Sequence, residues 1–179
     1  MEKRLRDLVI RYVIILVIGA PNLYLIYKIF TPLTLYPLYF LSSVFFDTSI
    51  VENVILIGNI SLEIIPACVA GAAYFLLLLL NLTTPMDKNQ RVKSLMFSIG
   101  GFYLVNIVRL FLFAILITKS VRIFDLTHMA TWYFLSTVLV VVIWFAAVKI
   151  YKIKKIPIYE DIRFLFSKSL LNSRRKKQK

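Results

Sequence analysis

Three residues in the chain combine types and positions that suit covalent chemistry. Cys68 is the only cysteine, and it follows Pro66 at the start of an apolar stretch. Arg109 lies inside the next apolar stretch, and His128, the only histidine, lies at the edge of the last one. A thiol can attack a carbonyl, a guanidinium can stabilise the resulting oxyanion, and an imidazole can carry the proton. The three types together predict a nucleophilic site.

The position of Cys68 favours a reactive thiol. Pro66 suits the first turn of a helix, so Cys68 would lie among unsatisfied N–H groups at the positive end of the helix dipole. That environment stabilises the thiolate, which is the nucleophilic form. The alternative is that this lone cysteine is a small apolar filler, which is the usual role of a cysteine in a membrane helix.

Arg109 is costly inside an apolar span and is therefore a functional-site hypothesis by default. Its structural alternatives are a pair with Glu63 or Asp125, or a side chain that snorkels outward. Asn106 lies three residues earlier on the same helical face, where it could orient the guanidinium or position a substrate backbone. His128 at a helix start is, taken alone, more often a capping or interfacial residue.

Composition assigns the chain to the membrane. The 179 residues suit one domain, yet 60% are hydrophobic, more than a soluble domain can bury. The net charge of +13 does not indicate nucleic acid, because 11 of the 22 Lys and Arg follow the last apolar stretch. Such clusters set topology and contact anionic lipids. A single cysteine excludes an internal disulfide, and we expect no cofactor and no metal site.

The predicted fold is an all-α integral membrane protein with about four transmembrane helices, each of about 20 residues. The expected spans are residues 8–30, 64–82, 94–118 and 129–148. Basic residues precede the first span, separate the second from the third, and fill the tail. All three regions then lie on the cytoplasmic side. We therefore expect a membrane domain over 1–150, a basic cytoplasmic tail over 151–179, and both termini in the cytoplasm.

Between the first two spans, residues 31–63 form an outer segment in this topology. Residues 33–46 are apolar but short, and Pro32 and Pro37 interrupt them. This stretch is predicted to be interfacial or re-entrant. The residues that follow predict a short extended hairpin over 54–63, with its turn at Gly58.

The same topology gathers the chemical residues on one side. Cys68 would lie about one turn into the second span, at the outer membrane face. Arg109 would lie in the outer half of the third span, and His128 would open the fourth span from outside. In the tail, apolar residues from Ile158 to Leu170 have roughly helical spacing, which suits an amphipathic helix on the membrane surface.

The order cysteine, arginine, histidine across successive spans resembles the exosortase and archaeosortase family of membrane cysteine transpeptidases. The resemblance covers roughly residues 58–132 and rests on Gly-Asn-Ile-Ser-Leu-Glu-Ile-Ile-Pro-Ala-Cys-Val-Ala-Gly (58–71), Asn-Ile-Val-Arg (106–109) and the region of His128. It implies that Cys68 is the nucleophile and that Arg109 and His128 are its catalytic partners. One departure is that Val69 and Ala70 precede Gly71, where the family has a small hydroxyl residue and then glycine.

The resemblance implies a function at the outer membrane face. The family cleaves the C-terminal sorting tail of secreted proteins and transfers them to an acceptor through a thioester. The implied partners are secreted proteins that end in a motif, an apolar helix and a basic cluster; the acceptor would be a lipid or another membrane amine or hydroxyl. Two alternatives remain: a non-catalytic four-helix scaffold or assembly factor, and a transporter or channel in which Arg109 binds an anion. A transporter would favour more polar helix faces and inverted repeats than the chain has.

Overall fold

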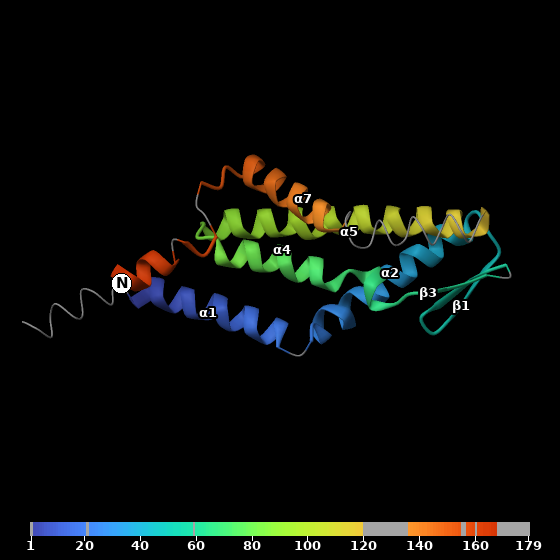
Figure 1. Ribbon diagram of the computed structural model, residues 1–179, viewed down its shortest axis with the longest axis horizontal. Coiled ribbons are helices and arrows are strands. Elements are labelled where there is room, and N and C mark those ends of the chain that lie inside the picture. The colour runs from blue at the N-terminus through green and yellow to red at the C-terminus, as the bar shows by residue number, and fades with distance from the viewer. Residues whose placement is uncertain are drawn as a thin grey trace, which may run out of the picture.

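The computed structural model describes residues 2–20, 22–58, 60–119, 136–154, 157–159 and 161–167. Within them the chain is mostly helical, with a small three-stranded sheet at one end of an elongated bundle (Figure 1). The elements are α1 (Glu2–Gly19), α2 (Tyr24–Ser43), β1 (Thr48–Val51), β2 (Val54–Ile57), β3 (Ile60–Glu63), α3 (Pro66–Val69), α4 (Gly71–Thr83), α5 (Lys88–Lys119) and α7 (Ser136–Ile150).

Two helical stretches of the described chain, Pro66–Thr83 and Lys88–Thr118, are long and apolar enough to cross a membrane. If the bent pair of α1 and α2 is counted as one span, there are three. The helix α7 is apolar but shorter. By length and composition the described residues therefore support two spans directly, where the sequence predicted four. The predicted start of the fourth span, at residue 129, lies outside the described residues.

The first predicted span, 8–30, was wrong as a single helix. α1 ends at Gly19, α2 begins at Tyr24, and the two helices are bent by 66°. Between them Asn22 and Leu23 have φ values of 49° and 60°. This left-handed conformation cannot continue a right-handed helix, so the apolar run divides here.

The prediction that two prolines break the outer segment was also wrong. α2 continues through Pro32 and Pro37 to Ser43. A proline in a helix lacks the N–H that the carbonyl four residues earlier would accept, and for Pro37 that carbonyl belongs to Leu33. The Tyr103 hydroxyl of α5 donates to the Leu33 oxygen at 2.8 Å. A donor on a neighbouring helix thus replaces the missing N–H, as membrane helices with proline require.

The predicted hairpin over 54–63 is confirmed. β2 and β3 pair antiparallel, with Ile55 opposite Leu62, and Gly58 has the positive φ of +57° in the turn. β1, which the sequence analysis did not predict, adds to the other side of β2. β1 and β3 are consequently the two edge strands.

Two apolar clusters hold the elements together. One joins the sheet to α2, α3 and α5, with Leu38 and Ile55 fully buried. The other joins α2, α4, α5 and α7 around Tyr74, whose ring stacks on Phe30 at 3.9 Å and meets Phe102 edge-on at 5.0 Å. α5, which has 32 residues, contributes to both clusters and so connects the sheet end of the bundle to α4 and α7.

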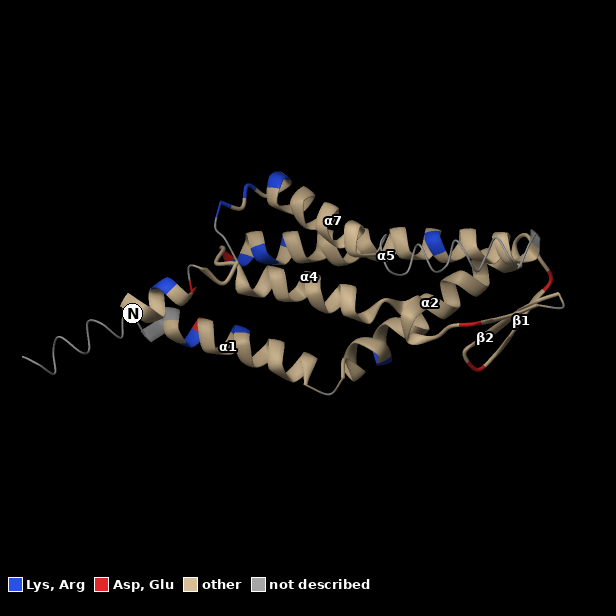
Figure 2. Ribbon diagram, in the orientation of Figure 1, with Lys and Arg blue, Asp and Glu red and all other residues tan. Residues whose placement is uncertain are grey.

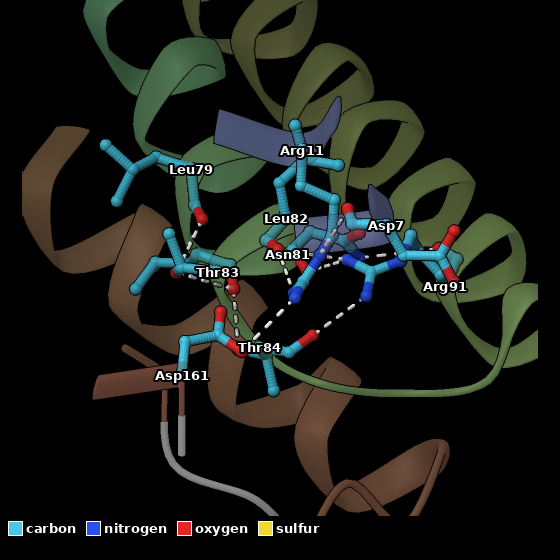
Figure 3. A network of polar contacts seen from close by, with 10 residues as sticks. Asp7, Arg11, Leu79, Asn81, Leu82, Thr83, Thr84, Arg91 and Asp161 are labelled. Carbon is cyan, nitrogen blue, oxygen red and sulfur yellow. Dashed lines mark hydrogen bonds and ion pairs between the residues drawn. The ribbon is translucent and has the colours of Figure 1, made fainter. Parts of the chain in front are cut away.

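Basic residues gather at the end of the bundle opposite the sheet (Figure 2). Arg11 donates to the Leu82 carbonyl at 2.8 Å and forms an ion pair with the buried Asp161 at 3.2 Å. Arg91 donates to the Leu82 and Thr84 carbonyls at 3.2 and 3.0 Å (Figure 3). These guanidinium groups satisfy carbonyls at the C-terminal end of α4, where cations are favourable. The network ties α1 and the start of the tail to the turn between α4 and α5.

The predicted tail helix is confirmed in part. Residues 161–167 are helical, and the apolar side chains of Ile162, Leu165 and Phe166 are exposed. Leu170, the last residue of the predicted face, lies outside the described residues. The exposed apolar side chains agree with a helix that lies on a membrane surface.

Candidate active site

Cys68 lies on a single helical turn that is set between two breaks in the backbone. Ile65 is extended, Pro66 opens α3 as predicted, and Ala70 closes it in the left-handed conformation, with φ 56° and ψ 43°. Because α3 has only four residues and Ala70 separates it from α4, the long helix dipole expected behind Cys68 is interrupted. The stabilisation of a thiolate by that dipole was therefore over-predicted.

Asn106 fixes the backbone of this turn. Its Nδ2 donates to the Cys68 carbonyl at 3.1 Å, and its side chain is buried. The last carbonyls of a helix lack partners within the helix, so the break at Ala70 leaves the Cys68 carbonyl in need of an outside donor. The sequence suggested that Asn106 orients Arg109 or a substrate; the structure places its amide on the backbone of Cys68 instead.

The Cys68 thiol faces a cavity of about 250 Å³ between β3 and α5. The thiol donates weakly to the Glu63 carbonyl, with sulfur and oxygen 4.0 Å apart. The cavity is lined on one side by consecutive residues of β3 and its extension, and on the other by apolar residues of α5: Ser61, Leu62, Glu63, Ile64, Ile65, Leu110, Phe113 and Ile117. Cys68 is 7% exposed, so a reagent or substrate must reach it through this cavity.

Arg109 is buried near the thiol but is directed elsewhere. Its Nη1 donates to the Ser136 hydroxyl of α7 at 2.7 Å, so the described partner is neither of the carboxylates suggested by the sequence. The guanidinium charge interacts electrostatically with the Cys68 thiol and with the Tyr74 hydroxyl. Its Nε is buried and has no hydrogen-bond partner among the described residues. The guanidinium therefore retains an unused donor.

A second cavity, of about 480 Å³, lies on the other side of α3 and is lined mainly by small residues of α3 and α4. Ser136 lines this second cavity, and Cys68 does not. In this conformation the thiol and the hydroxyl bound by Arg109 therefore belong to different cavities.

Two residues of the site were missed by sequence reasoning. Ser136 is one of two adjacent hydroxyl residues at the start of an apolar helix, and Tyr74 is one aromatic among many, so neither carries a signal of its own. Their roles depend on helices that are distant in sequence.

The third predicted catalytic residue, His128, lies outside the described residues, as does Asp125. Among the described residues no group of three or more His, Cys, Asp or Glu is placed to hold a metal ion. Comparison with family models, curated proteins and solved structures finds no match to the chain. Function is therefore argued from the site alone.

Proposed function

We propose that the chain is a membrane-embedded cysteine transpeptidase of the exosortase and archaeosortase type. The observation that supports this most directly is the setting of Cys68. The only thiol of the chain faces a cavity beside a strand edge, and the Asn106 amide fixes its backbone. The charge of Arg109 acts on that thiol from within an apolar span, where an arginine is costly.

The proposed reaction has two halves. The Cys68 thiolate attacks a peptide carbonyl in the substrate's C-terminal tail; the C–N bond breaks, the tail departs as an amine, and a thioester forms. An amine or hydroxyl of the acceptor, for which we propose a membrane lipid, then attacks the thioester and releases the thiol. Arg109 turns from Ser136 to the oxyanion, and His128 protonates the leaving amine and deprotonates the acceptor.

The proposed topology places this chemistry in the outer half of the membrane. The basic end of the bundle, which includes Arg91 and Lys93 at the start of α5, lies on the cytoplasmic side. Asn106 lies roughly 20 Å further along α5, at about 1.5 Å per residue, within a hydrocarbon core about 30 Å thick. A substrate tail with an apolar helix and a basic cluster would run alongside and end at the same basic face.

A non-catalytic scaffold remains the second candidate, and one observation favours it. The hydrogen bond of 2.7 Å between Arg109 and Ser136 joins α5 to α7. In a scaffold this bond is the whole role of the arginine, and Cys68 serves only to pack. The scaffold reading therefore predicts that replacing the thiol has no consequence.

The test follows the processing of secreted proteins that carry a C-terminal apolar helix and basic cluster, in cells with each variant. Cys68→Ala should abolish processing while the protein stays folded and in the membrane. Arg109→Lys should be severely impaired, because an ammonium lacks the planar fork of donors. Ser98→Ala is the matched control, since its buried hydroxyl on α5 has no described partner.

Gel shifts report processing, and blots report the amount of each variant. If Cys68→Ala processes the tail at the wild-type rate, Cys68 is not the nucleophile and the transpeptidase proposal fails. Loss of the Arg109→Lys protein alone, with Cys68→Ala accumulating like wild type and tail processing unchanged, favours the scaffold.

A further inference from the structure

β3 presents a free edge beside the thiol. In an antiparallel strand, each residue directs its N–H and C=O to the same side, and successive residues alternate. Ile64 donates its N–H to the Asn53 carbonyl at 2.8 Å, so Ile64 and Leu62 face β2. Ser61 and Glu63 consequently direct their backbone groups away from β2. In the part of the chain that the structure describes, β3 pairs with no other strand.

The cavity at Cys68 runs along this edge. Residues 61–65 all line it, although side chains on a strand alternate between the two faces. A cavity in contact with consecutive residues must therefore touch the backbone edge of the strand. The Glu63 carbonyl points into the cavity, because the Cys68 sulfur lies 4.0 Å from its oxygen. A paired strand would lie about 4.8 Å from β3, so the sulfur occupies the path of an added strand.

We propose that the substrate binds as an extended strand on the free edge of β3. This inference rests on the proposed function. The occupant is the peptide segment that precedes the membrane helix of the substrate tail, which forms backbone hydrogen bonds with Ser61 and Glu63. Strand addition of this kind gives affinity through the main chain and selectivity through pockets for alternate side chains. The opposite cavity wall, with Leu110 and Ile117, is apolar, so the substrate side chains that face it are small or apolar.

Binding in this mode also frees the nucleophile. Among the described residues, the Glu63 carbonyl accepts the weak S–H contact from Cys68. A peptide N–H is a stronger donor and takes over that carbonyl, which releases the thiol. The same movement brings a carbonyl of the added strand beside the sulfur. Binding of the substrate strand and release of the thiol therefore happen in the same step.

Proline substitution tests the edge directly. Ser61→Pro removes an N–H that faces the cavity, and proline is tolerated on an edge strand where the N–H lies outside the ladder. Ser61→Ala keeps that N–H. Thr48→Pro is the control on the other edge: the Asp47 carbonyl accepts from the N–H of Gly58, which directly follows β2, so Thr48 faces away from β2. We expect Ser61→Pro to lower tail processing about tenfold or more, Ser61→Ala to lose less than Ser61→Pro, and the control Thr48→Pro to process at the wild-type rate.

An N-methyl scan tests the same contact with the wild-type protein. The substrate is identified as the secreted protein whose tail stays uncleaved in cells with Cys68→Ala. The probe is a synthetic peptide with the sequence of the cleavage region of that tail. N-methyl groups are placed on one residue at a time, and cleavage is measured in lipid vesicles. Strand pairing predicts that every second position blocks cleavage, because only alternate N–H groups face β3.

The outcomes separate the two proposals. Normal cleavage by Ser61→Pro, or an N-methyl scan without alternation, overturns strand binding. If Cys68→Ala is inactive in the same experiments, the transpeptidase proposal still stands. Normal processing by Cys68→Ala overturns both. If Ser61→Pro fails to accumulate, the scan decides, since it needs no variant.

Discussion

Replacing Asn106 with alanine should loosen the turn that carries the thiol. The Asn106 amide donates to the Cys68 carbonyl at 3.1 Å, and both residues are buried. The break at Ala70 keeps that carbonyl out of the hydrogen-bond ladder of α4. Alanine leaves the carbonyl without its donor in an apolar setting. We therefore expect α3 to open more often and to expose the sulfur.

The size of the effect follows from the cost of the lost bond. Leaving a buried carbonyl unsatisfied costs about 1–3 kcal/mol in soluble proteins. Hydrogen bonds between membrane helices are worth less, about 0.6 kcal/mol on average and up to about 1.7. A loss of about 1–1.5 kcal/mol is therefore expected for Asn106→Ala. At about 1.4 kcal/mol per factor of ten, α3 should open roughly 5- to 12-fold more often.

The assay is the rate at which a small alkylating reagent modifies the purified protein in lipid vesicles. Cys68 is the only cysteine of the chain, so all labelling reports on α3. Asn106→Ala should label roughly 5- to 12-fold faster than wild type if opening limits access. Ser98→Ala, which removes a buried hydroxyl without a described partner from the same helix, should label at the wild-type rate. Equal rates for Asn106→Ala and wild type would refute the role assigned to the amide.

Three further expectations concern contacts that hold the bundle, each measured by reversible unfolding in mixed detergent. Tyr103→Phe should cost about 1 kcal/mol in wild type and less in a Pro37→Ala background, because alanine restores an N–H to the same carbonyl; equal losses would contradict this. Gly71→Ala should cost about 1–3 kcal/mol, since its new Cβ would lie 2.6 Å from a tyrosine ring, whereas Gly100→Ala meets open space and should not show that loss. Asp161→Asn should cost about 1.5–3 kcal/mol by removing a charged hydrogen bond of 3.2 Å, with a smaller loss in high salt; no change would show that the pair is dispensable.

Local patterns were enough for some elements. Apolar residues on either side of Gly58 predicted the hairpin, and Pro66 predicted where a helix would begin. The order of the apolar runs also brought Arg109 to the neighbourhood of Cys68, because helices that are adjacent in sequence pack side by side in a small bundle. These features depend on residues close in sequence or on simple connectivity.

The errors came from partners that are distant in sequence. Pro37 looked like a helix breaker because nothing nearby replaces its missing N–H; the donor is Tyr103, on another helix. Ala70 carries no turn signal, since alanine disfavours the left-handed conformation that it adopts here. The choice of Ser136 as the partner of Arg109 likewise depends on how α5 and α7 pack. At these residues, contacts between elements distant in sequence determine the conformation, and the local sequence preference does not.

The central claim, that Cys68 is a nucleophile, is tested most directly by trapping its thioester. The protein is purified with a tail-bearing secreted protein from the same cells, and its intact mass is measured before and after treatment with neutral hydroxylamine. The account predicts an added peptide that maps to Cys68, is released by hydroxylamine, and is absent from Cys68→Ala. Two results would contradict the account. One is tail processing by Cys68→Ala, and the other is tail processing by the wild type without any adduct on Cys68 under trapping conditions.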